Sequence, residues 1–134
     1  MTRFFDTNIL VYAFLDIAKR QRAIEVLSEG GLISVQVLNE FTNVARNKRK
    51  RTWPEIEAAL DVIRSRFPKI VLLTVEVHAA AVRLARDHGL SIYDALIVAA
   101  ALEAGCDTLF SEDLQHQRSF GPLRIVNPFV ESPS

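Results

Sequence analysis

The sequence predicts an α/β protein with a mainly parallel sheet. Short apolar runs alternate with longer stretches of helical period, and no low-complexity linker or internal repeat separates them. The length of 134 residues is near the commonest size of one domain, so we expect residues 1–134 to form a single domain. Hydrophobic residues make up 49% and charged residues 24%, which are the proportions of an ordinary globular protein.

The N-terminal segment is expected to form a strand and then helix. Residues 3–5 are a short strand. Residues 9–15 begin a helix, which residues 18–29 either extend or follow as a second helix. Two glycines at 30–31 end this helical stretch, because glycine is favoured just beyond the last turn.

A weak strand at residues 32–33 is expected to lead into two more helices. Ser34 can cap the first of them. Its apolar side chains form one stripe, consisting of Val37, Leu38, Phe41, Val44 and Ala45. A capping box over residues 52–55, with a proline in the first turn, opens the second, which runs to about residue 67.

The C-terminal half continues the alternation of strands and helices. The expected strands are residues 70–73, 108–110 and 123–126. Thr74 can cap a helix over 75–88. Ser91 and Asp94 open the next helix, whose residues 95–104 are apolar nearly all round, so we expect it in the middle of the fold.

The composition excludes several classes of protein. Lys+Arg and Asp+Glu both number 16, so attraction to a nucleic acid must come from local patches. The single cysteine, Cys106, excludes an internal disulfide and a thiolate metal site. No apolar run reaches the ~20 residues of a membrane span, and Asp6 and Asn8 interrupt an N-terminus that lacks a signal-peptide cleavage pattern. We therefore expect a cytoplasmic protein.

Four carboxylates fall near one edge of the expected sheet. Asp6 directly follows the first strand, and Asp113 lies a few residues after the strand at 108–110. Asp94 is in the first turn of the buried helix, and Glu40 is in the second turn of the helix after the second strand. In an open parallel sheet, ligands bind beyond the carboxyl ends of the strands. We therefore expect these four side chains to converge.

Converging carboxylates need a cation or altered protonation to persist, because they repel one another. Mg²⁺ and Mn²⁺ prefer carboxylate and water oxygens, and the chain lacks the Cys and His sets that select zinc. A magnesium ion held by two or three carboxylates can activate water and stabilise the charge that develops on a phosphodiester. The cluster therefore predicts magnesium-dependent phosphoester hydrolysis, with Mn²⁺ as a substitute metal.

Each acid also has a structural interpretation. Residues 6–8 can be a strand end and a helix cap, and Asp94 can be the capping-box partner of Ser91. Glu40 can lie on a solvated helix face, and the acids at 112–113 can belong to a turn. Their common placement at one edge favours one site over four coincidences.

Four segments resemble the signature segments of PIN-domain nucleases: FFDTNILVYA, VLNEF, SIYDALIVAAALEAG and LFSEDL. They occur in the order and spacing typical of that family, from residue 3 to about residue 129. Within the family, the resemblance is closest to VapC-type toxins of bacterial toxin–antitoxin pairs.

The resemblance implies roles for six residues. The implied catalytic metal ligands are Asp6 and Asp94, then Glu40 as the third acid and Asp113 as the fourth, more variable one. The implied supporting polar residues are Asn8 and Ser111. The resemblance also implies a three-layer α/β/α fold, endoribonuclease activity, a homodimer, and a cognate antitoxin that occludes the site. Glu112 and Asp113 are adjacent, so either could be the fourth acid, and our prediction is Asp113.

A basic run follows the helix that carries Glu40. Its cations are Arg46, Lys48, Arg49, Lys50 and Arg51. Cations at a helix C-terminus meet the negative end of the helix dipole, which is a purely structural interpretation. Alternatively, the run binds RNA phosphates and Trp53 stacks on bases. Because an acidic site repels RNA, some basic surface is expected near it.

Two other functions are consistent with parts of the sequence. A magnesium-dependent α/β phosphatase would use Asp6 as a nucleophile, but such enzymes usually have a second Asp two residues later, where this chain has Asn8. A PIN-like domain that has lost activity could instead bind a partner only. The four intact acids argue against that second alternative.

Overall fold

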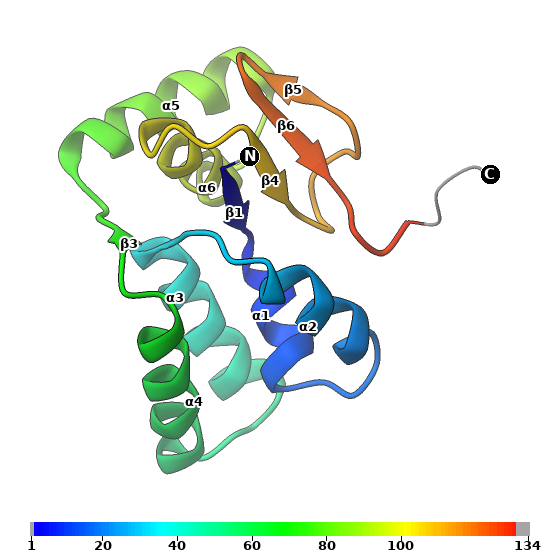
Figure 1. Cartoon of the computed structure of the whole chain (residues 1–134). Helices are drawn as coiled ribbons and strands as arrows, with labels where there is room; N and C mark the ends of the chain where they lie inside the picture. The colour runs from blue at the N-terminus through cyan, green and yellow to red at the C-terminus, as the bar shows by residue number, and fades with distance from the viewer. Residues whose placement is uncertain (1, 131–134) are drawn as a thin grey trace.

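The computed structural model describes residues 2–130, and its centre is a mainly parallel sheet (Figure 1). The strands are β1 (Arg3–Phe5), β2 (Ile33–Ser34), β3 (Ile70–Val71), β4 (Thr108–Phe110), β5 (Ser119–Phe120) and β6 (Leu123–Val126). One sheet has the order β1-β4-β6-β5, with only the β5–β6 pair antiparallel. β2 and β3 form a parallel pair, which a bridge between Phe4 and Leu32 joins to β1.

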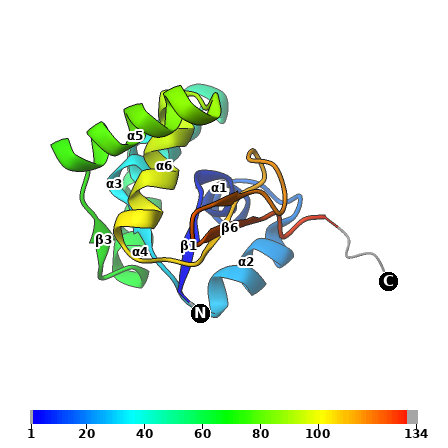
Figure 2. The same cartoon turned by 90° about the horizontal axis from the view of Figure 1, so that it is seen from above.

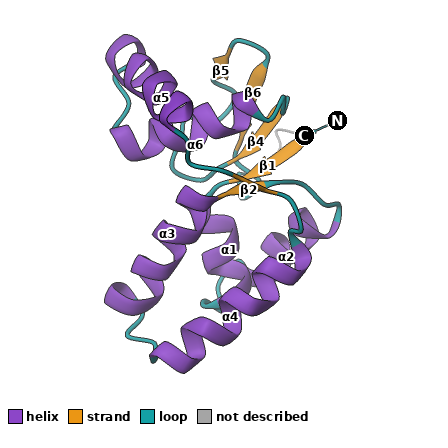
Figure 3. Ribbon diagram, turned by 90° about the vertical axis from the view of Figure 1, so that its left-hand side faces the viewer, coloured by secondary structure: helices purple, strands orange, loops and turns teal. Residues whose placement is uncertain are grey.

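Helices cover both faces of this sheet. They are α1 (Thr7–Phe14), α2 (Arg20–Ser28), α3 (Val35–Asn43), the π-helical η1 (Val44–Lys48), α4 (Trp53–Arg66), α5 (Val75–His88) and α6 (Ile92–Glu103). Strands β1 and β6 lie between α2 on one side and the packed pair α5 and α6 on the other (Figures 2 and 3). The predicted three-layer α/β/α architecture with a mainly parallel sheet is therefore confirmed. Among the described residues, no helix is both long enough and apolar enough to span a membrane.

Local sequence signals explain where the helices begin. A side-chain oxygen accepts a hydrogen bond from the backbone N–H three residues later at each of the predicted caps, which are Ser34, Thr52, Thr74 and Ser91. Glu55 completes the predicted capping box. Each cap satisfies a backbone donor that a helix otherwise leaves free. Helix α5 ends at Gly89, whose φ of 67° is a conformation that favours glycine.

The helix predicted to be central occupies the core. Seven consecutive residues of α6, from 95 to 101, are buried. The strands add large buried side chains, among them Phe5, which stacks on Phe110 with ring centroids 5.8 Å apart. Helix α6 packs against α5, α3 and β2, and Asp94 lies at the start of its buried run.

Several boundaries differ from the prediction. Helix α1 begins at Thr7 rather than residue 9, because the carboxylate of Asp6 accepts a hydrogen bond from the Thr7 N–H and caps the helix. Residues 15–19 separate α1 from α2, so the second helix follows the first rather than extending it. Strand β3 has two residues instead of four, since Leu72 and Leu73 are exposed beyond its pairing with β2. β5 and the π-helix were not predicted.

Candidate active site

The carboxyl ends of three parallel strands meet where the candidate site lies. The Asp6 N–H donates to the Phe110 carbonyl at 2.9 Å, which joins the end of β1 to the end of β4. The Ser111 N–H donates to the Val126 carbonyl at 3.0 Å, which joins β4 to β6. Residues that follow these strands are therefore held side by side at one edge, as expected for an open parallel sheet.

Asp6 is the most deeply placed acid of this edge, with 3% of its surface exposed. Its Oδ1 accepts from the Thr7 N–H at 2.7 Å, and its Oδ2 accepts from the Ser111 hydroxyl at 2.7 Å. Burial raises the pKa of Asp6 to about 7; the two hydrogen bonds oppose this effect, whereas the charges of Glu40 and Asp113 add to it. The charge of Asp6 therefore changes close to neutral pH rather than in the acid range.

Glu40 projects from the second turn of α3 and is half-buried. Its Oε1 accepts from the Thr7 hydroxyl at 3.3 Å, and its Oε2 accepts from the Gln36 amide at 3.0 Å. Burial raises the pKa of Glu40, the two hydrogen bonds lower it, and repulsion from Asp94 and Asp113 raises it further. Gln36 and Thr7 were not predicted as site residues, although the i, i+4 spacing of Gln36 and Glu40 places both on one helix face.

Asp94 lies in the first turn of α6, and its backbone N–H donates to the Ser91 hydroxyl at 3.1 Å. The cap thus uses the backbone of Asp94, and within residues 2–130 its carboxylate accepts no hydrogen bond from another group. The negative charge of Asp94 raises the pKa of both Glu40 and Asp113, which places all three acids within electrostatic reach of one another.

The last acids, Glu112 and Asp113, have different partners. Oδ2 of Asp113 accepts from the Asn8 amide at 2.9 Å, and burial followed by the charge of Asp94 raises the pKa of Asp113. Glu112 instead accepts hydrogen bonds from Tyr12 and Lys19, each at 2.6 Å. Asp113 is therefore coupled to the acid cluster, while Glu112 is engaged in an ion pair. The assignment of Asp113 as a metal ligand stays a prediction.

The donor set of the acid cluster suits a hard cation. All four predicted ligands are carboxylates, and buried Asp6 has no cationic partner among residues 2–130. In the same part of the chain, no three Asp, Glu, His or Cys side chains are grouped closely enough to hold a metal ion as they stand. Polar neighbours instead hold three of the carboxylates, those of Asp6, Glu40 and Asp113. Mg²⁺ and Mn²⁺ fit oxygen donors of this kind.

The basic run is divided by its contacts. Arg49 makes two hydrogen bonds of 2.7 Å to Asp16, and the Arg51 guanidinium donates to the Leu15 carbonyl at the end of α1. Arg46 lies over the ring of Trp53 at 4.9 Å. Lys48 and Lys50 are exposed, and the charge of Lys48 lowers the pKa of Asp113. Arg49 and Arg51 thus have structural partners, whereas Lys48 is exposed and within electrostatic reach of Asp113.

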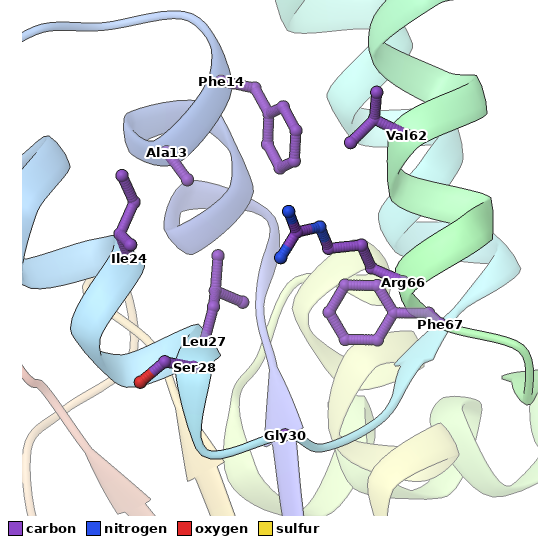
Figure 4. A pocket seen from close by; sticks show the side chains of 9 residues that line it. All are labelled: Ala13, Phe14, Ile24, Leu27, Ser28, Gly30, Val62, Arg66 and Phe67. Atoms are coloured by element: carbon purple, nitrogen blue, oxygen red, sulfur yellow. The ribbon is translucent and has the colours of Figure 1, made fainter.

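The clearest cavity of the described chain lies elsewhere, between α1, α2 and α4 (Figure 4). It measures about 440 Å³ and is lined by Ala13, Phe14, Ile24, Leu27, Ser28, Gly30, Val62, Arg66 and Phe67. None of these residues is acidic, and Arg66 is the one charged residue among them (Figure 4). The cavity is therefore separate from the candidate active site.

Comparison with known proteins identifies a family and a fold. The family model described as "PIN domain" matches residues 3–119. The comparison with curated proteins returns no match. A toxin–antitoxin complex from Klebsiella pneumoniae is 21% identical, with a TM-score of 0.73 over 96% of this chain and 98% of that chain. VapC20 from Mycobacterium tuberculosis, described as a sarcin-ricin loop cleaving toxin, is 17% identical, with a TM-score of 0.70 over 84% and 92%. VapBC2 from Rickettsia felis, bound to a DNA fragment from its promoter, is 25% identical, with a TM-score of 0.65 over 93% and 97%.

Proposed function

The chain belongs to the PIN-domain family, and from this premise we propose that it is a magnesium-dependent endoribonuclease, the toxin of a toxin–antitoxin pair. The observation that carries the proposal is that Asp6 is buried at the carboxyl edge of the sheet with no cationic partner among residues 2–130, while the charges of Glu40 and Asp113 act on it and that of Asp94 acts on both of these acids. A buried carboxylate among like charges, with a pKa raised as that of Asp6 is, is typical of a functional site.

The four acids would hold Mg²⁺, or Mn²⁺ in its place, each through carboxylate oxygens. When bound, the metal ion supplies an activated water and stabilises the charge that develops on the cleaved phosphodiester. The protein supplies orientation: the Ser111 hydroxyl and the Thr7 N–H fix both oxygens of Asp6, and Gln36 holds Glu40. Hydrogen bonds to ligating carboxylates set their geometry, so these neighbours act on affinity as well as on position.

The proton on Asp6 is part of the proposed mechanism. Because burial raises the pKa of Asp6 to about 7, a proton would compete with a cation for this carboxylate. A bound cation would offset both the burial of Asp6 and its repulsion by Glu40 and Asp113. These properties support a site that favours a metal-bound state over a free one.

Structural neighbours support the choice of substrate and partner. The M. tuberculosis neighbour is described as cleaving the sarcin-ricin loop, and the K. pneumoniae neighbour is described as a toxin–antitoxin complex. By likeness to them, we propose RNA as the substrate, a cognate antitoxin as the partner, a homodimer as the assembly and the cytoplasm as the location. Light scattering of the purified chain tests the assembly: a mass near 15.0 kDa would contradict the homodimer.

Cleavage of a mixed RNA pool tests the activity. The chain is purified free of antitoxin and incubated with Mg²⁺ or with EDTA. We expect cleavage only with Mg²⁺. Asp6→Asn and Asp94→Asn should each lower the cleavage rate by roughly 1,000-fold or more, which exceeds the 10–100-fold loss typical of residues that only contact a metal ligand. Asp61→Asn is the matched control, because Asp61 is an exposed acid on α4 that pairs with Arg64.

Four results would contradict the proposal. Retained cleavage in Asp6→Asn or Asp94→Asn would remove the proposed site. Cleavage that persists in EDTA would remove the metal requirement. Phosphate release from a small phosphoester without RNA cleavage would support the phosphatase alternative, and RNA binding without either reaction would support a binding-only domain.

A further inference from the structure

Hydrogen bonds from Tyr12 and Lys19 hold the carboxylate of Glu112, the residue that precedes Asp113. Glu112 accepts a 2.6 Å hydrogen bond from the Tyr12 hydroxyl through Oε1 and a 2.6 Å bond from the Lys19 ammonium through Oε2. Both oxygens of its carboxylate are therefore occupied. Sequence separations of 100 and 93 residues make this a tertiary contact between α1, the segment after it and the 111–114 loop.

Two aromatic rings surround the Lys19 ammonium group that binds Glu112. The Lys19 ammonium lies 5.0 Å from the centre of the Tyr12 ring and 5.2 Å from that of Phe129, and the two rings meet edge to face. Lys19 also has a φ of 63°, a backbone conformation that is uncommon for a residue with a side chain. Such a conformation persists where the surrounding contacts fix it, and it is enriched at functional sites.

These contacts bear on which carboxylate reaches the metal site. The 111–114 loop is pinned at its start, because the Ser111 hydroxyl donates to Asp6 and accepts from the Leu114 N–H. Between these fixed points stand two acids, Glu112 and Asp113. Glu112 is held by Tyr12 and Lys19. Asp113 accepts a hydrogen bond from the Asn8 amide, and the charge of Asp94 raises its pKa.

We propose that Tyr12 and Lys19 are positioning residues that hold the Glu112 carboxylate out of the acid cluster, so that the loop presents Asp113 alone as the fourth acid. This inference rests on the proposed metal site. Lys19 also neutralises one carboxylate in a region that already carries four, which reduces the repulsion acting on Asp113. The clamp, meaning Tyr12, Lys19 and Glu112, thus selects between two adjacent carboxylates.

Binding of Mn²⁺ alone, measured by calorimetry on the purified chain without RNA, tests the clamp. We expect Tyr12→Phe and Lys19→Met each to weaken Mn²⁺ binding roughly 3- to 10-fold, at or below the low end of outer-contact effects. Lys19→Arg keeps the cation and should stay within about twofold of the wild type. Lys69→Met is the matched control, because Lys69 is exposed and precedes β3, at the opposite end of the strands. Circular dichroism and melting temperatures establish that each variant is folded.

A cycle with Asp113→Asn makes the test specific for selection between the two acids. In the wild-type background this change should weaken Mn²⁺ binding markedly. In the Tyr12→Phe, Lys19→Met background, the released Glu112 can take part, so the further loss on adding Asp113→Asn should be smaller. Equal losses in both backgrounds would overturn the clamp, as would wild-type affinity in the Tyr12→Phe, Lys19→Met protein.

The result separates the clamp from the proposed function. Metal binding that depends on the clamp, in a chain that cleaves no RNA, would support the clamp and overturn the ribonuclease. Metal-dependent RNA cleavage with no effect of the clamp variants on Mn²⁺ affinity would overturn the clamp alone. A wild-type chain that binds no Mn²⁺ would overturn both.

Discussion

Strand β1 is flanked by two buried charges, Arg3 at its start and Asp6 directly after its end, and the fold treats them differently. Arg3 is 8% exposed, forms an ion pair with Glu29, donates to the Val26 carbonyl at 2.8 Å and lies 4.6 Å from the centre of the Phe110 ring. Asp6 is 3% exposed, accepts two hydrogen bonds and is repelled by neighbouring acids.

The difference separates a structural charge from a functional one. A buried charge with an opposite partner and hydrogen bonds is compensated, so the fold can depend on it. A buried charge among like charges raises the free energy of the unliganded protein, and it persists in proteins mainly where a ligand or a reaction needs it. By this criterion, Asp6 at the carboxyl edge of the sheet is a candidate for a functional charge, which agrees with the proposal that a cation binds there, and Arg3 at the opposite edge is a structural charge.

Arg3→Met should produce the largest change in stability. Removal of one partner of a buried ion pair is typically worth 3–5 kcal/mol, and because Glu29 is 68% exposed we expect the free energy of unfolding to fall by roughly 3 kcal/mol. Urea denaturation measures this change, and Arg83→Met on the exposed face of α5 is the control. A loss no larger than that of the control would contradict the structural role of Arg3.

Metal binding should depend steeply on pH through Asp6. Because the pKa of Asp6 is raised to about 7, a proton competes with the cation below that pH, and the affinity for Mg²⁺ should rise close to tenfold per pH unit between pH 5 and 7. Calorimetry at several pH values measures this slope. In Asp6→Asn the remaining dependence should be much weaker, and an unchanged slope would assign the proton to another acid.

Asp6→Asn should stabilise the metal-free protein at high pH. The pKa of Asp6 is raised in the folded state, so its ionisation lowers stability as pH rises from the unfolded value of 3.8 to about 7, and the penalty is complete above that range. With EDTA present, we expect Asp6→Asn to raise the free energy of unfolding by roughly 1–2 kcal/mol at pH 8, which is about the free energy that corresponds to one pKa unit. Near pH 4 we expect almost no change. Thermal melts at the two pH values measure the difference, and equal effects at both would contradict a raised pKa.

The features that the sequence predicted correctly are those encoded locally. Ser34, Thr74 and Ser91 cap helices as predicted, because a cap involves only the next three residues. The antiparallel strand β5 could have been found from the Gly-Pro pair at 121–122, which is a turn signal that our prediction did not use.

What could not be predicted depends on contacts between distant segments. Gln36 donates to Glu40 within one helix, but only the fold shows that Glu40 also accepts a hydrogen bond from Thr7. The difference between Glu112 and Asp113 depends on Tyr12, 100 residues away, so no local pattern could resolve it. The prediction that the acids converge rests on topology, because each one lies just beyond a strand or in an early turn of a helix.

The distinction between compensated and free charges also divides the basic run. Arg49 is paired with Asp16, whereas Lys48 has no ion-pair partner among the described residues and acts on Asp113. We expect Lys48→Ser to weaken RNA binding and to reduce the slope of log affinity against log salt by about one, since one phosphate contact is lost. Arg49→Ser should instead lower the melting temperature and leave that slope unchanged. Both variants are compared by salt titration of RNA binding in the Asp6→Asn background, in which the RNA stays intact. Equal slopes for Lys48→Ser and Arg49→Ser would show that an ion pair within the fold does not decide which cations bind RNA.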